Sequence, residues 1–124
     1  MYFIKNYKFT LIVGIIILIS ILMPGRDIPS VEIPHIDKIV HCGMFGCLTL
    51  CFYGEHYYKY RKYPKEWLVI GVIAGYCALT EVLQKLASGR SCDPIDWLAD
   101  VTGILLAVVV FHIGVNYYKN KTVK

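Results

Sequence analysis

The stretch WLADVTGILLAVVVFHIGV, residues 97–115, decides the fold. It holds 19 residues, and its only Asp, Glu, Lys or Arg is Asp100. A helix of about 20 apolar residues crosses a bilayer, whereas strands span lipid only within a closed barrel. Three further apolar runs of 15 to 17 residues precede it, at 9–23, 39–53 and 67–83. We therefore predict an all-α membrane protein with four transmembrane helices in an up-down bundle.

The first two runs are short for a helix that crosses the bilayer perpendicularly. We expect residues 2–10 to continue the first helix, with Lys5 and Lys8 reaching the interface, and residues 37–40 and 54–58 to lengthen the second. A secretory signal peptide is the alternative for the first run. The run ends Ile-Leu-Met-Pro, without the small-x-small cleavage site of such peptides, so we expect an uncleaved span.

The composition is that of a membrane protein with one domain, residues 1–124. Hydrophobic residues make up 56% of the chain and charged residues 18%, and the mean hydropathy is +0.52. Soluble domains are about 45–50% apolar and about 25% charged, and disordered chains are of low hydrophobicity. These values exclude a soluble monomer and a disordered chain. The formal net charge is +4, but the basic residues punctuate apolar runs, so we expect no nucleic-acid partner.

Zinc sites and thioredoxin-like redox sites typically contain a Cys-x-x-Cys motif. The cysteines of this chain show no such spacing. There are five of them: Cys42, Cys47, Cys51, Cys77 and Cys92. Four lie inside apolar stretches, and we interpret these as small hydrophobic residues. The sequence names no cofactor.

Lysine and arginine set the expected orientation in the membrane, because they are enriched in cytoplasmic loops. The N-terminus, the loop at 59–65 and the C-terminus carry nine of them, against four elsewhere. We predict that both termini are cytoplasmic and that segments 24–38 and 86–96 face outward. Tyrosine and tryptophan crowd the cytoplasmic edge, as an aromatic belt does.

Polar residues on the second and third helices point to a site at the outer side. In Asp37-Lys38-x-x-His41, spacings of three and four residues put all three side chains on one face. Asp37 also fits a charge favoured by the helix dipole. Glu81 of the pair Glu81-x-x-Gln84 lies one to two turns below the interface and should face other helices, where it pairs with a cation or is neutral. Gln84 also fits a simple helix-to-helix hydrogen bond.

The fourth helix adds a stripe of carboxylates. Asp93 before Pro94 is typical of a helix start, and Asp96 falls in the capping-box position. Asp96 and Asp100 lie four residues apart and repel each other unless a cation, a basic side chain or a proton separates them. Gly103 on the same stripe permits a neighbouring helix to approach closely. His112 lies about 18 Å further along the helix, and we expect no link to this site.

Taken together, Asp37-Lys38-x-x-His41, Glu81-x-x-Gln84 and Arg90-x-x-Asp93-x-x-Asp96 followed by Gly103 resemble the VanZ-like family, over residues 35–110. The resemblance implies a small multi-pass protein of the bacterial cytoplasmic membrane. The founding member of that family is associated with low-level resistance to teicoplanin, a lipoglycopeptide antibiotic. The family usually has Asn where this chain has Asp100, so an extra carboxylate is present here.

We favour a binding or accessory role, in which the outer site recognises an anionic envelope component or a lipid-linked cell-wall precursor. Lys38 and Arg90 would hold phosphate or carboxylate, and Arg can do so with two hydrogen bonds. The lipid bilayer is a partner in any case, and a homo-oligomer is open. The candidate ligand-binding residues are Asp37, Lys38, His41, Glu81, Gln84, Arg90, Asp93, Asp96 and Asp100.

Two other functions remain open. The first is an intramembrane hydrolase or transferase acting on an envelope lipid, with His41, Glu81 and Asp96 as catalytic candidates. In that case Asp93, Asp96 and Asp100 are candidates for holding a divalent cation, although no metal-site spacing supports it. The second is that the polar residues only hold the helices together.

Overall fold

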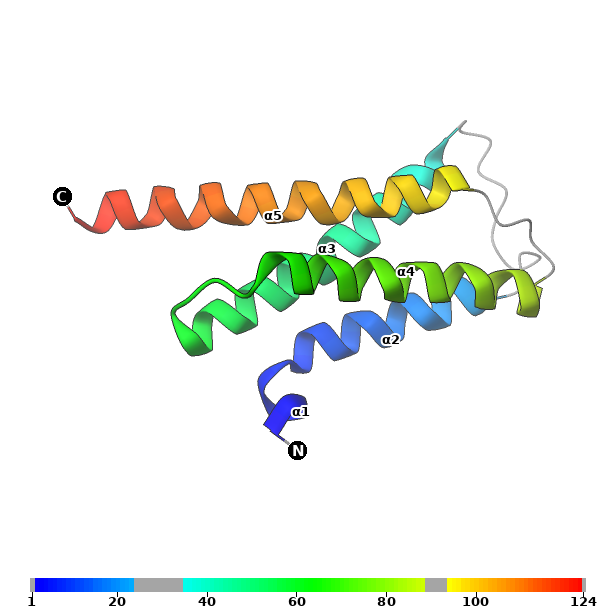
Figure 1. Cartoon of the computed structure of the whole chain (residues 1–124), viewed down its shortest axis with the longest axis horizontal. Helices are drawn as coiled ribbons and strands as arrows, with labels where there is room; N and C mark the ends of the chain where they lie inside the picture. Colours follow the sequence, from blue (N-terminus) through cyan, green and yellow to red (C-terminus); the bar gives the residue numbers. More distant parts are fainter. Residues whose placement is uncertain (1, 24–34, 89–93, 124) are drawn as a thin grey trace.

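The computed structural model describes residues 2–23, 35–88 and 94–123. This part of the chain contains five α-helices and no strand: α1 (Tyr2–Asn6), α2 (Lys8–Leu22), α3 (Ile36–Tyr60), α4 (Glu66–Ser88) and α5 (Pro94–Thr122). The long helices alternate in direction, so that α2 and α4 run one way and α3 and α5 the other (Figure 1). The all-helical prediction is confirmed.

Three helices of the described chain are long and apolar enough to cross a bilayer, namely α3, α4 over Glu66–Ala87, and α5. The protein is thus a helical membrane protein. α2 has 15 residues, which corresponds to about 22 Å of helix against about 30 Å of hydrocarbon. A fourth span therefore stays a prediction.

The expectation that residues 2–10 continue the first helix is confirmed for residues 8–10 and wrong for residues 2–7. α1 ends at Asn6, α2 begins at Lys8, and Tyr7 between them has φ −126° and ψ 44°, outside the helical region. The Tyr7 side chain is buried, and its hydroxyl forms a 2.8 Å hydrogen bond with His56 Nδ1 of α3. The break at Tyr7 is thus stabilised by contacts with α3, which the sequence around Tyr7 does not reveal.

The side chain of Glu55, in α3, caps the N-terminus of α2. Its carboxylate accepts hydrogen bonds from the backbone N–H groups of Phe9 (2.8 Å) and Thr10 (3.1 Å) and from the Thr10 hydroxyl (2.6 Å). The first N–H groups of a helix have no partner inside the helix, and an acidic group at this end also matches the helix dipole. One carboxylate therefore begins α2 and ties it to α3.

The closest packing is between α3 and α5, which are not neighbours in the sequence. A Cβ added at Gly103 of α5 would overlap the backbone carbonyl oxygen of Cys42 and lie 2.9 Å from its carbonyl carbon. A Cβ added at Gly46 of α3 would lie 3.3 Å from the Gly103 oxygen. The expected role of Gly103 in admitting a neighbouring helix is confirmed.

α2 packs against α3 and α4 and, within the described residues, makes no contact with α5. The Tyr76 hydroxyl of α4 donates a 2.7 Å hydrogen bond to the Gly14 carbonyl oxygen of α2. The core between the helices consists of apolar residues from all four long helices: Ile17, Ile21, Phe45, Leu48, Tyr53, Val69, Ile73, Cys77, Ile104 and Val108.

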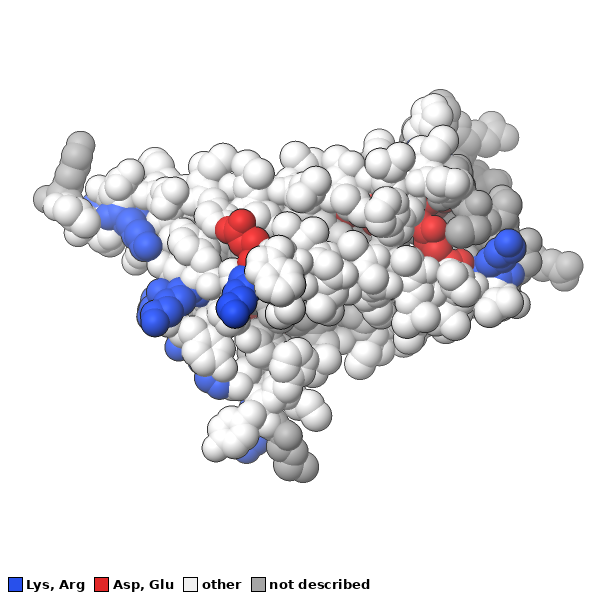
Figure 2. Space-filling model, in the orientation of Figure 1, with Lys and Arg blue, Asp and Glu red and all other residues white. Residues whose placement is uncertain are grey.

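The outer surface is largely apolar along the middle of the bundle. Ile39, Val72, Val109 and Ile113 are each about half exposed or more. Figure 2 shows Lys and Arg at the end where α3 ends and α4 begins, with a smaller group at the opposite end and an uncharged stretch between them. A wide apolar band between charged ends suits a lipid environment.

Candidate functional site

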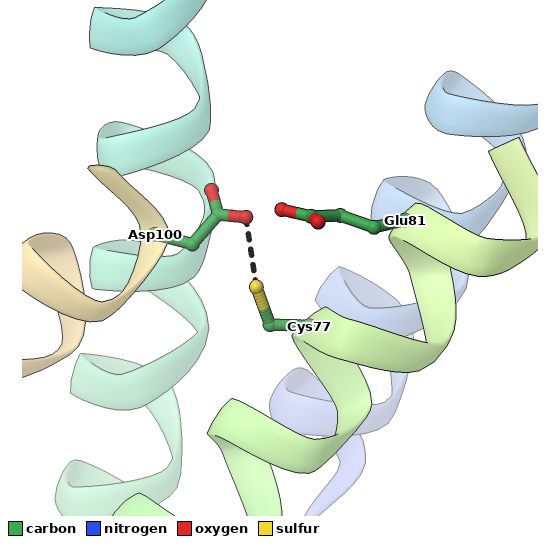
Figure 3. Close-up of side chains that lie close together, drawn as sticks. All are labelled: Cys77, Glu81 and Asp100. Carbon is green, nitrogen blue, oxygen red and sulfur yellow. Dashed lines mark hydrogen bonds between the residues drawn. The ribbon is translucent and has the colours of Figure 1, made fainter. Parts of the chain in front are cut away.

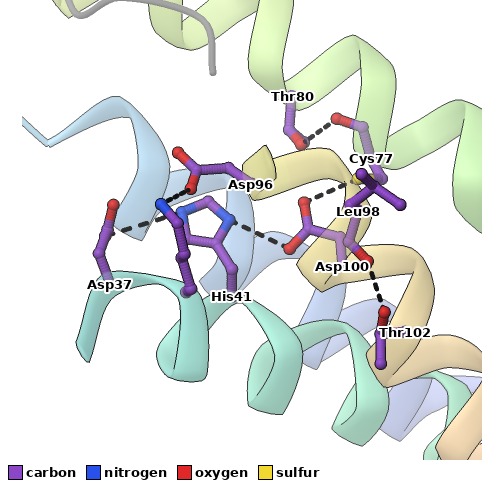
Figure 4. A network of polar contacts seen from close by, with 9 residues as sticks. Asp37, His41, Cys77, Thr80, Asp96, Leu98, Asp100 and Thr102 are labelled. Atoms are coloured by element: carbon purple, nitrogen blue, oxygen red, sulfur yellow. Dashed lines mark hydrogen bonds and ion pairs between the residues drawn. The ribbon is translucent and has the colours of Figure 1, made fainter. Parts of the chain in front are cut away.

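A network of polar side chains connects α3, α4 and α5 at the end of the bundle where α3 and α5 begin (Figure 4). Its outermost pair joins Lys38 of α3 to Asp96 of α5, with Nζ 3.2 Å from Oδ1. The Lys38 side chain is 28% exposed and that of Asp96 18%, so the ammonium group is the more accessible of the two.

His41 and Asp100 form the buried centre of the network. His41 Nδ1–H donates to Asp100 Oδ1 at 3.1 Å, and the two residues are 5% and 0% exposed. The other ring nitrogen, Nε2, lies 3.9 Å from Asp37 Oδ1, one turn earlier on α3. Buried polar groups need partners, so this bond fixes the imidazole ring between a deep carboxylate and a shallow one.

Cys77 of α4 is the second hydrogen-bond partner of Asp100. Its thiol donates a 2.8 Å hydrogen bond to Asp100 Oδ2, so both carboxylate oxygens accept a bond from a buried group. The Thr80 hydroxyl donates to the Cys77 carbonyl oxygen at 2.7 Å. We interpreted Cys77 as a small hydrophobic residue; it is buried, but that interpretation missed its hydrogen bond. Its spacing of four residues from Glu81 was the available signal.

Glu81 lies on the same face of α4 and points toward Asp100 (Figure 3). Sγ of Cys77 and one carboxylate oxygen each of Glu81 and Asp100 lie within 4.8 Å of one another. Thiolate and carboxylate groups at such separations can bind a transition-metal ion, and three ligands leave a position open for water or substrate. Because Glu81 and Asp100 lie so close together, a cation or a proton is needed to offset the repulsion between their carboxylates.

The structure therefore brings together most of the residues predicted from the sequence. Asp37, Lys38, His41, Glu81, Asp96 and Asp100 all lie at this end of α3, α4 and α5. Gln84 lies one turn beyond Glu81 on α4 and is partly buried. Arg90 and Asp93 fall outside the described residues.

The Lys38–Asp96 pair agrees with the expectation that a basic side chain offsets the repulsion between Asp96 and Asp100. One detail differs from the sequence interpretation. The metal-ligand candidates were Asp93, Asp96 and Asp100, whereas within the described residues the close set is Cys77, Glu81 and Asp100. The partners come from other helices, so spacing along one helix could not identify them.

His112 lies apart from this network. Its Nδ1–H donates to the Val108 carbonyl oxygen at 2.8 Å, and its Nε2 lies 2.9 Å from Glu66 Oε1 at the start of α4, which is the opposite end of that helix. The expectation that His112 has no link to the network agrees with this position.

The network can position charge and protons. Asp100 holds the His41 ring in one orientation and favours the proton on Nδ1, which leaves Nε2 for exchange at the shallow side. Asp96 holds the cationic Lys38 side chain at the partly exposed edge of the network. Asp96 and Asp100 lie about 6 Å apart in depth along α5, in its first and second turns.

A family model described as VanZ/LLP1 matches residues 1–115 of the chain. Comparison with curated proteins and with solved structures found no match. The matched region includes α1 to α4, the first part of α5 and every residue of the polar network. On this match, the chain belongs to the VanZ/LLP1 family.

Proposed function

We propose that this membrane protein binds an anionic component of the bacterial cell envelope, a phosphate-bearing lipid or a lipid-linked cell-wall precursor, at the polar network. The observation that carries the proposal is the convergence of Lys38 and His41 with Asp96 and Asp100 on apolar membrane helices. Ionisable groups are costly inside a membrane and are usually retained for function.

The chemistry of the rim supports an anionic ligand. Lys38 is a cation at the accessible edge of the network, with a side chain 28% exposed, and it pairs with one carboxylate oxygen of Asp96. His41, oriented by Asp100, can present Nε2–H beside it. Arg90, which follows α4 and lies outside the described residues, is the further cation of this proposal.

We also propose that both termini are cytoplasmic and that four helices span the membrane. In support, lysine and arginine gather where α3 ends and α4 begins (Figure 2), which is the pattern of cytoplasmic loops. In this arrangement α2 is the first of the four spans. The polar groups at its start, Glu55 and Lys8, would lie at the membrane surface. The polar network then faces the outside, where envelope precursors are assembled.

The test measures lipid binding to the purified full chain in detergent by native mass spectrometry. Phosphatidylglycerol and undecaprenyl phosphate are compared with their uncharged counterparts, diacylglycerol and undecaprenol. We expect the phosphorylated member to bind more tightly, and the two phosphorylated probes distinguish an ordinary headgroup from a lipid-linked carrier. Lys38→Gln should weaken binding about 10- to 150-fold, because a hydrogen bond to a charged group contributes about 1.5–3 kcal/mol.

Lys85→Gln is the matched control, since Lys85 is an exposed lysine of α4 toward the same end. It should leave affinity within about twofold, as exposed ion pairs contribute about 0–1 kcal/mol. Equal affinity for charged and uncharged probes, or equal effects of the two substitutions, would contradict the proposal.

A second candidate is an intramembrane hydrolase or transferase acting on an envelope lipid. The observation that favours it is the His41–Asp100 hydrogen bond, because a carboxylate that orients a histidine prepares the other ring nitrogen for proton transfer. Glu81 lies close enough to Asp100 to take part, whereas Asp96 is occupied by Lys38. Loss of product formation from a labelled lipid in His41→Gln, with binding retained, supports this candidate over binding alone.

The third alternative, a purely structural network, predicts a different result. His41→Gln and Glu81→Gln would then lower the unfolding midpoint in detergent and change lipid binding only as much as they change folding. For a cellular test we choose teicoplanin susceptibility, because the founding member of the family is associated with resistance to it. Expression of the wild-type chain should raise the inhibitory concentration, and Lys38→Gln should abolish the increase.

A further inference from the structure

A second candidate site lies away from the polar network, between α2, α3 and α4. A cavity of about 540 Å³ opens between these helices, and Phe3 of α1 borders it. Leu11, Ile15 and Leu18 of α2 face Leu68, Val72 and Tyr76 of α4 across it. The volume lies within the usual range for ligand pockets, about 300–1,000 Å³.

The lining has no unmet hydrogen bonds. It includes two side-chain hydroxyl groups, and both are already bonded within the protein. The Thr10 hydroxyl donates to Glu55 at 2.6 Å, and the Tyr76 hydroxyl donates to the Gly14 carbonyl oxygen at 2.7 Å. A polar ligand would find no partner there, so the chemistry of the cavity selects an apolar chain.

The cavity is short enough to lie within one leaflet. Its lining on α4 runs from Leu68 to Tyr76, and on α2 from Thr10 to Leu18, which is about 12 Å along each helix. Half of the hydrocarbon core is about 15 Å thick. Both stretches lie toward the ends where α2 and α4 begin (Figure 1). The acyl chains that reach the cavity therefore come from the leaflet at this end.

Basic residues stand close in the sequence to this end of the cavity lining. Lys5, Lys8 and Lys65 are exposed and lie two or three residues from the first lining residues of α1, α2 and α4. Each lysine or arginine near a membrane surface contributes about 1 kcal/mol of attraction to anionic lipids, which is about fivefold in affinity. The charge thus complements a phosphate group whose acyl chain enters the cavity.

We propose that the cavity holds one acyl chain of an anionic glycerophospholipid, with its phosphate between Lys8 and Lys65. The acyl chain would fill the space that α2, α3 and α4 enclose. The site lies at the opposite end of the bundle from Lys38, so it is independent of the function proposed above.

The charge arm of the test compares phosphatidylglycerol with phosphatidylcholine of identical acyl chains, by native mass spectrometry of the full chain in detergent. Wild type should prefer phosphatidylglycerol, and Lys8→Gln with Lys65→Gln should lower that preference about 25-fold, at fivefold per lysine. The control is Lys121→Gln, because Lys121 is an exposed lysine near the end of α5, away from the cavity, and this variant should leave the preference unchanged. An unaltered preference in the double variant overturns the proposal.

The cavity arm uses two exposed isoleucines of α2. Ile15 borders the cavity and Ile19 does not, while their exposed fractions are similar at 57% and 61%. Ile15→Trp should fill the space and lower retention of both lipids at least fivefold, and Ile19→Trp should not. Thermal unfolding of each variant confirms that it is folded. Equal retention by the two tryptophan variants overturns the proposal, as does retention of a second copy of the chain in place of lipid.

Discussion

Replacing Gly103 with alanine is expected to force α3 and α5 apart. The added methyl group would overlap the Cys42 carbonyl oxygen and lie 2.9 Å from the carbonyl carbon and 3.0 Å from Cα. Carbon atoms in favourable contact are about 3.5–4.0 Å apart. Since these are backbone atoms, no side-chain rotation relieves the overlap, and the helices must separate by about 0.5–1 Å.

The free-energy cost follows from a comparison with a second glycine of α5. A Cβ added at Gly114 has no atom within 4 Å, so Gly114→Ala experiences only the helix-propensity gain, about 0.5–1 kcal/mol. Gly103→Ala has the same gain and, in addition, the cost of overpacking, about 1–3 kcal/mol. The propensity term cancels between the variants, so Gly103→Ala should be less stable than Gly114→Ala by about 1–3 kcal/mol.

Equilibrium unfolding in mixed detergent micelles, followed by circular dichroism, measures this difference. Asp100 lies one turn from Gly103, and His41 is the neighbour of Cys42, so helix separation should also weaken lipid binding at the polar network. Equal unfolding free energies for the two alanine variants would refute the close α3–α5 contact and the reasoning built on it.

Three further predictions concern individual hydrogen bonds. Asp100→Leu should lower the unfolding free energy by about 2–4 kcal/mol, because it leaves buried donors unpaired, His41 among them; Asp100→Asn should lower it less, and equal losses would contradict the assigned bonds. Glu55→Ala should cost about 1–2 kcal/mol and accelerate tryptic cleavage near the start of α2; an unchanged cleavage rate would contradict its capping role. Tyr76→Phe should cost about 1 kcal/mol in the same unfolding assay, and no change would mean that its bond to Gly14 contributes nothing.

The helices and their polar faces were predictable because both depend on short spacings. Asp37 and His41, like Asp96 and Asp100, lie four residues apart, and helix geometry alone puts each pair on one stripe. Apolar run length identified the three helices that are long enough to cross a bilayer, and α3 (Ile36–Tyr60) includes the extensions expected at 37–40 and 54–58.

The pairing between helices was not predictable from these spacings. Lys38 meets Asp96 and His41 meets Asp100 because α3 and α5 approach closely in one register, and that register depends on Gly103. Local patterns do not specify which of several helices becomes the neighbour.

Two features depended on tertiary contacts that leave little local trace. The break at Tyr7 follows from bonds to Glu55 and His56, 45 to 49 residues away. Cys77 was assigned to the apolar core on residue type, and only the approach of Asp100 from α5 gives its thiol an acceptor.

The pairing of α3 with α5 also has a consequence for biogenesis. A chain emerges from the ribosome with its N-terminal segments first, so α3 enters the membrane before its main partner has been translated. Until then His41 lacks the carboxylate that accepts its hydrogen bond, and α2, held by Glu55, is the first helix available to shield that region. The polar network is thus the last part of the protein to assemble, and a nascent chain that stops before α5 lacks it altogether.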